Sequence, residues 1–131
     1  MSPLAEEAHK LLRLAIRDLR ACDALLLAPG LDQAVAAFHA QQAAEKALKA
    51  VLVLRGLESR RTHDLEELAS RLELQGLALP VTQADLTLLT PYAVEFRYQE
   101  GIPSLLTGAQ ARQMAESLVS WAAAILNAAA A

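Results

Sequence analysis

The sequence lacks the cysteine pairs and metal-ligand clusters that stabilise or activate many small proteins. Its 131 residues include a single cysteine, Cys22, which excludes an intramolecular disulfide and a thiolate metal cluster. Cys22 falls within an apolar helical run, so we expect a buried, unreactive thiol rather than a nucleophile. The Glu-x-x-His spacing of di-iron bundles occurs at Glu6 and His9 and has no second copy. We therefore predict no metal site and no cofactor.

Aromatic residues, strand patterning and long apolar runs are also scarce. Aromatic residues make up 4% of the chain, whereas hydrophobic residues, dominated by Ala and Leu, make up 54%. Ala and Leu favour helix, so we expect one all-α domain over residues 1–131. No apolar run reaches the roughly 18–20 residues that a membrane span needs, and no secretory signal is visible. We expect a cytoplasmic protein with no membrane association.

The charge balance gives little support for a surface that coats nucleic acid, because the net charge is −3. Arg13, Arg17 and Arg20 do form a local basic stripe. No aromatic residue interleaves them for base stacking, so the stripe is more typical of a solvated helix face. Binding of nucleic acid stays open at this stage.

Capping residues and apolar spacing predict about five helices in an up-and-down bundle. The first two expected helices run from Ser2 to Gly30 and from Asp32 to Gly56. The third runs from the N-cap Thr62 to Gly76, and the fourth begins at the N-cap Thr82 and continues through a kink at Pro91. A last helix follows a loop at 99–107. The first helix is expected to bury an apolar stripe of Leu4, Ala8, Leu11, Ala15, Leu19, Cys22 and Leu26. The last helix is expected to bury Met114, Leu118, Trp121 and Ile125.

The second helix carries an unusual density of hydrogen-bonding side chains. One face consists of Ala44, Ala47, Leu48, Val51 and Leu52. The opposite face carries, at spacings of 3, 4 and 3, His39, Gln42, Lys46 and Lys49, with Glu45 beside them. Two interpretations fit this pattern: a solvated face supported by the Glu45–Lys49 ion pair, or a surface that binds a ligand or partner.

Two further segments contain residues suited to binding. In Arg-Thr-His-Asp-Leu at 61–65, Asp64 either favours the dipole of a helix start or is oriented, with His63, toward Arg97. In Phe-Arg-Tyr at 96–98, Arg97 either interacts with the last carbonyls of its helix or contacts a phosphate.

Together these three segments resemble the HEPN domain (higher eukaryotes and prokaryotes nucleotide-binding) in its small stand-alone prokaryotic form. The resemblance covers nearly the whole chain and implies a HEPN-like bundle that acts as a homodimer. It also implies a nucleotide ligand or a partner, namely a minimal nucleotidyltransferase in a toxin–antitoxin-like pair. The ligand- or partner-binding residues implied in this way are His39, Gln42, Glu45, Lys46, Lys49, His63, Asp64, Arg97 and Tyr98.

The nuclease motif of the family, an Arg followed after four to six residues by a His, is missing. The positions that would hold the His after Arg97 are Ile102, Pro103 and Ser104, and none exchanges a proton near neutral pH as His does. No Arg lies five to seven positions before any of the three histidines. We therefore predict no catalytic residues, and the nucleotide-acceptor role of the motif Tyr does not carry over to Tyr98. The alternatives are a ribonuclease toxin with a degenerate or rewired site and a helical dimeric protein with another partner.

Two structural expectations follow. Seven residues are expected to border one shared cleft: His39, Gln42, Lys46, His63, Asp64, Arg97 and Tyr98. A homodimer is expected because apolar residues wrap most of the first helix, namely Leu11, Leu12, Leu14, Ile16 and Leu19.

Overall fold

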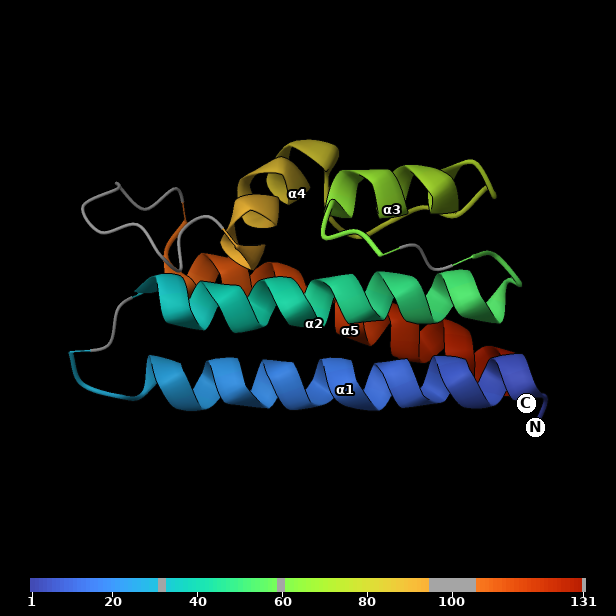
Figure 1. Cartoon of the computed structure of the whole chain (residues 1–131), viewed down its shortest axis with the longest axis horizontal. Coiled ribbons are helices and arrows are strands. Elements are labelled where there is room, and N and C mark those ends of the chain that lie inside the picture. The colour runs from blue at the N-terminus through green and yellow to red at the C-terminus, as the bar shows by residue number, and fades with distance from the viewer. Residues whose placement is uncertain (31–32, 59–60, 95–105, 131) are drawn as a thin grey trace.

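Three long helices lie side by side and carry two shorter helices across one flank (Figure 1). The computed structural model describes residues 1–30, 33–58, 61–94 and 106–130, and its helices are α1 (Pro3–Leu26), α2 (Gln33–Leu54), α3 (Leu65–Glu73), α4 (Gln83–Leu89), the 3₁₀ helix η1 (Thr90–Ala93) and α5 (Gly108–Ala130). These ranges contain no strand, and none of their helices combines the length and apolarity needed to cross a membrane. The predicted all-α up-and-down bundle is confirmed.

Helix α2 lies at the centre of this arrangement, in contact with α1, α5, α3 and η1. Its fully buried side chains are mostly small: Ala36, Ala37, Ala40, Ala43, Ala44, Ala47 and Ala50. Alanine adds little bulk between helix axes, so neighbouring helices can pack closely on several sides of α2. Polar side chains on such a helix lie beside other helices instead of projecting into bulk solvent.

Helix α1 begins as predicted. Ser2 is its N-cap, and the Ser2 hydroxyl accepts a hydrogen bond from the Ala5 amide at 3.1 Å. The predicted apolar stripe is partly wrong, because Leu4 is 50% exposed and Leu12 is buried in its place. Leu4 lies in the first turn, beyond most of the core.

The predicted N-cap of α3 is wrong by two residues. Asp64, rather than Thr62, is the N-cap, and its carboxylate accepts a hydrogen bond from the Glu67 amide at 3.2 Å. The Thr62 hydroxyl instead accepts a hydrogen bond from the Asp64 amide at 3.1 Å. This places Leu65, the first helical residue, in the core.

Thr82 caps α4 as predicted, but Pro91 does not kink the helix. The α-helix ends at Leu89, and the chain continues as η1. Pro91 has no amide hydrogen, so it cannot continue the α-helical hydrogen-bond ladder. The buried hydroxyl of Tyr92 then accepts a hydrogen bond from the Leu106 amide at 3.0 Å, which joins η1 to the approach of α5.

The buried face of α5 is also rotated from the predicted one. Of the four predicted residues only Leu118 is fully buried, whereas Met114, Trp121 and Ile125 are partly buried at its edges. The fully buried residues include Ala111, Ala115, Ala122 and Leu126. Close packing against the alanine face of α2 favours small side chains where α5 contacts α2, and the bulkier residues lie beside this contact.

Candidate binding site on the α2 face

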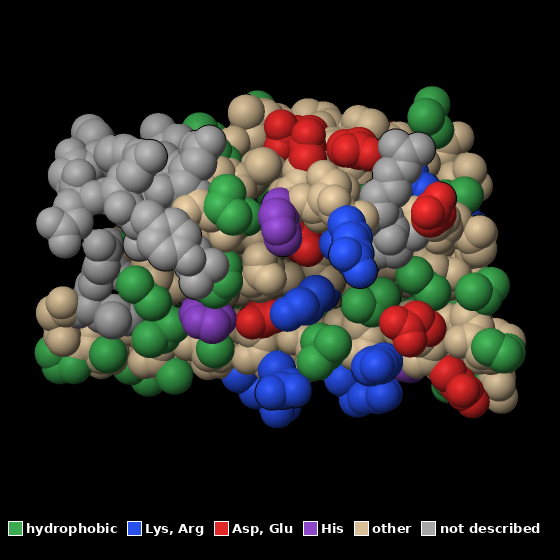
Figure 2. Space-filling view, viewed as in Figure 1, with side chains coloured by type: hydrophobic (Ala, Val, Ile, Leu, Met, Phe, Trp, Pro, Cys, Tyr) green, Lys and Arg blue, Asp and Glu red, His purple; other side chains and the backbone are tan. Residues whose placement is uncertain are grey.

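The polar residues of α2 are half-buried and meet partners from two flanks. Histidine, lysine and acidic side chains gather over α2 on one face of the molecule, and basic side chains follow the edge where α1 lies (Figure 2). His39, Gln42, Lys46 and Lys49 are all partly buried, and Glu45 is only 5% exposed. The predicted Glu45–Lys49 ion pair is present, and this face packs partly against its neighbours instead of being fully solvated.

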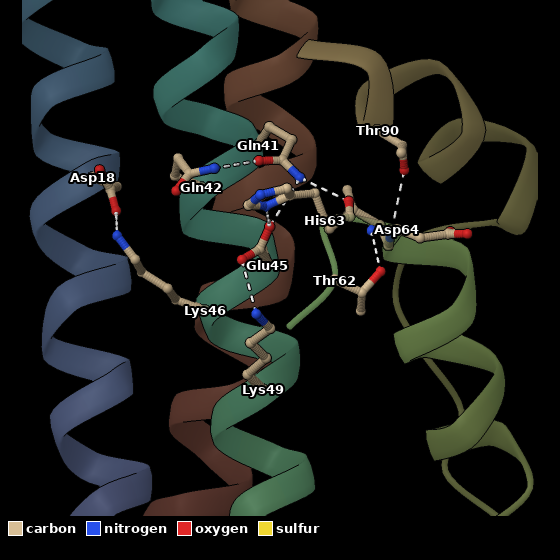
Figure 3. Close-up of polar contacts among 11 residues, drawn as sticks. Asp18, Gln41, Gln42, Glu45, Lys46, Lys49, Thr62, His63, Asp64 and Thr90 are labelled. Carbon is tan, nitrogen blue, oxygen red and sulfur yellow. Dashed lines mark hydrogen bonds and ion pairs between the residues drawn. The ribbon is translucent and has the colours of Figure 1, made fainter. Parts of the chain in front are cut away.

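On the α3 flank, the carboxylate of Glu45 is the centre of a buried polar network (Figure 3). It contacts His63 Nδ1 at 2.8 Å, Lys49 Nζ at 3.0 Å and Gln41 Nε2 at 3.4 Å. Gln41 is fully buried and also donates to the carbonyl of His63 at 3.1 Å. The network therefore fixes the segment that leads into α3 against the side of α2.

On the α1 flank, the carboxylate of Asp18 joins two residues of α2. It forms an ion pair with Lys46 Nζ (Figure 3), and it lies 3.3 Å from His39 Nδ1. An open groove of about 280 Å³ lies here, lined by Leu14, Arg17, Asp18, Ala21, His39 and Lys46. Two cationic side chains and a histidine thus meet at the mouth of one groove.

The remaining predicted residues have other positions. Gln42 Nε2 donates to Gln41 Oε1 at 2.7 Å, and Asp64 is the N-cap of α3. Arg97 and Tyr98 lie outside the described residues. Through Asp18, His39 and Lys46 lie on the α1 flank of α2, whereas His63 contacts Glu45 on the α3 flank. The groove lined by His39 and Lys46 does not include His63, so the predicted shared cleft is wrong for these residues.

The sequence analysis missed three residues that the structure brings to this face: Asp18, Arg17 and Gln41. Asp18 is an acidic residue within the basic stripe of α1, and this break in the charge pattern is a signal that could have identified it. Arg17 was assigned only to a solvated face, and it is indeed exposed, but it also lines the groove. Gln41 lies one turn before Glu45, which was the available clue to their contact.

The arrangement suits recognition of an anionic group on the α1 flank and proton exchange on the α3 flank. Arg and Lys side chains bind phosphate oxygens, and Arg can contact two of them at once. His63, held by Glu45 through one ring nitrogen, has a side chain that is 57% exposed. Within the part of the chain that the structure describes, no three His, Cys, Asp or Glu side chains are placed to hold a metal ion.

Comparisons with known proteins place the chain in a family. The model of the HEPN domain matches residues 8–130. The crystal structure of ST0689, an archaeal HEPN homologue, is similar with a TM-score of 0.68 at 24% identity, covering 92% of this chain and 98% of that chain. The crystal structure of TT1696 from Thermus thermophilus is similar with a TM-score of 0.56 at 30% identity, covering 92% of this chain and 94% of that chain. A search of curated proteins gave no match. The protein belongs to the HEPN domain family, as the three sequence segments predicted.

Proposed function

We propose that the protein works by binding, either of a nucleotide or as the HEPN subunit of a toxin–antitoxin-like pair with a minimal nucleotidyltransferase, and that it does not cleave RNA. The observation that carries this proposal is the Glu45 network, which holds His63 and Lys49 at the surface of a helix otherwise built from alanine and leucine. A preorganised polar surface binds with a smaller loss of side-chain entropy than a mobile one. The missing Arg-x(4–6)-His motif supports binding over catalysis.

The partner proposal predicts a minimal nucleotidyltransferase gene beside that of this chain, and it is tested by co-expression of the two proteins. We expect the two proteins to elute together, and we expect H63A, which removes the exposed histidine of the network, to weaken the complex. The matched control is K10A, an exposed lysine on α1 away from the network. Separate elution of the two wild-type proteins at micromolar concentration would rule out this partnership.

A rewired ribonuclease is the second candidate, because Glu45 orients His63 as a carboxylate orients a catalytic base. The test is incubation of total RNA with the pure wild-type protein, H63A and R97A. We expect no cleavage above a blank by any of the three. Robust cleavage by the wild type that either substitution abolishes would establish the ribonuclease and exclude the non-catalytic account.

A homodimer remains part of the proposal. The side chains that suggested it are largely packed within the chain: Leu12 is buried, and Leu11, Ile16 and Leu19 pack against the core. Exposed apolar side chains elsewhere include Leu27 and Val35, near the α1–α2 connection. Sedimentation at micromolar concentration is expected to give twice the chain mass, and a monomer alone would contradict the homodimer.

A further inference from the structure

The groove between α1 and α2 contains more positive charge than its own carboxylate can neutralise. Arg17 and Lys46 contribute two positive charges and Asp18 one negative charge, which leaves a net charge of +1 with His39 neutral. Asp18 is the shared partner of Lys46 and His39, and its side chain is 15% exposed. The carboxylate thus occupies the position at which an incoming anion would meet both groups.

We propose that this groove binds the phosphate chain of a small nucleotide, and that Asp18 is an internal competitor for the same cations. The proposal rests on the nucleotide-binding part of the function proposed above but not on the protein partner. A phosphate chain bears several charges and several acceptor oxygens, whereas Asp18 offers one charge. It can therefore engage Arg17 and Lys46 together when Asp18 turns aside.

The size of the groove favours the phosphate chain over the whole nucleotide. Its volume is about 280 Å³, whereas pockets that enclose a complete small ligand span roughly 300–1,000 Å³. Among the described residues, its apolar lining is limited to Leu14 and Ala21, and none of those that line it is aromatic and suited to stacking on a base. We therefore expect inorganic pyrophosphate alone to bind, and the base to contribute less than the phosphates.

The test is calorimetric titration of inorganic pyrophosphate into the wild-type protein and its variants at low salt. Removing one cation in K46A is expected to weaken binding about tenfold, and R17A about threefold because Arg17 is more exposed. The matched control is R13A, an exposed arginine one turn earlier on α1 that does not line the groove, and it should leave binding unchanged.

The direction in which Asp18→Asn changes the affinity for pyrophosphate shows whether Asp18 competes with the ligand or supports its binding. A competing carboxylate predicts tighter pyrophosphate binding by D18N, about fivefold, because the net charge of the groove rises from +1 to +2. A carboxylate that only positions Lys46 predicts weaker binding by D18N, which would overturn the proposal. Thermal melting of D18N confirms that the variant is folded when it is titrated.

Two further outcomes would exclude the groove site, and a third would exclude only the protein partnership. Equal weakening by R13A and R17A would mean a diffuse basic stripe, as for RNA, and would exclude a defined groove site. Absence of pyrophosphate binding in both the wild type and D18N would exclude the groove, while co-elution with the nucleotidyltransferase would still support the proposed partnership. Pyrophosphate binding without co-elution would support the groove as a binding site and exclude the partnership.

Discussion

The two flanks of α2 repeat one motif in different surroundings. On each flank a carboxylate joins a histidine and a lysine: Asp18 with His39 and Lys46 toward α1, and Glu45 with His63 and Lys49 toward α3. The Glu45 side chain is 7% exposed and has the buried amide of Gln41 as a third partner. Asp18 instead lines an open groove, and its lysine is 27% exposed.

This difference indicates that similar charges serve different purposes. A buried carboxylate with several donors becomes costly to disturb, because each donor loses a partner that water cannot easily replace. A carboxylate at the edge of a groove has partners that can turn to solvent or to a ligand. We infer that the α3 flank keeps a fixed structure, which can present His63 to a protein partner, whereas the α1 flank is available to a phosphate-bearing ligand.

The largest expected effect is on the stability of the α3 flank. Glu45→Ala removes the acceptor shared by His63, Lys49 and Gln41, and should lower the free energy of unfolding by about 2–3 kcal/mol. Asp18→Ala should cost about 1 kcal/mol or less, because the Asp18 side chain is 15% exposed against 7% for Glu45, and its partners Lys46 and His39 are both partly exposed. Urea unfolding measures both, and equal losses would remove the distinction between the flanks.

A smaller effect is expected at the start of α3, which the Glu45 network supports. Asp64→Ala removes the N-cap and should lower the free energy of unfolding by about 1 kcal/mol. Thr62→Ala should cost less than half as much, because Thr62 accepts a hydrogen bond from the Asp64 amide, which lies outside the helix, and does not cap α3 itself. Asn at position 64 should retain most of the stability. A larger loss of stability for Thr62→Ala than for Asp64→Ala would indicate that Thr62 is the N-cap.

The smallest effect concerns Cys22, which is fully buried on the core-facing side of α1. Burial raises the pKa of the Cys22 thiol to about 11, with a further rise from the neighbouring charge of Asp23. Because the folded pKa exceeds the ordinary value of 9.0, this group's contribution to stability is complete below pH 9 and is lost as the pH rises toward about 11. We expect a thiol reagent at pH 8 to label Cys22 only after unfolding. Rapid labelling of the native protein would show that this face of α1 opens.

The fold was largely predictable because its signals are local. Ser2 and Thr82 cap their helices as expected, and alanine-rich periodicity identified α2. The wrong assignments lie where local signals compete. Thr62 and Asp64 both suit an N-cap, and burial of Leu65 decides between them. Pro91 shows only that an α-helix cannot continue, and whether the chain kinks or changes helix type depends on packing around Tyr92.

The site was less predictable because its contacts join distant segments. Lys46 and Asp18 lie 28 residues apart, and their contact depends on the rotation of α1 against α2. Helical periodicity fixes the faces of each helix but not which faces meet. The contact of Gln41 with the carbonyl of His63 spans 22 residues and could not be predicted from the sequence either. Most α2 residues of the site were predicted, but Gln41 and the α1 partner Asp18 were not.

The central claim is tested most directly by paired measurements on Lys46→Ala and Lys49→Ala, two lysines one turn apart on α2. Each variant is unfolded in urea and titrated with pyrophosphate. Lys46→Ala should stay within about 0.5 kcal/mol of the wild type in stability and bind pyrophosphate about tenfold more weakly. Lys49→Ala should lose about 1–2 kcal/mol, since its side chain is 14% exposed, and bind pyrophosphate as the wild type does. Similar behaviour of the two variants, or the reverse assignment, would contradict the division of α2 into a structural flank and a binding flank.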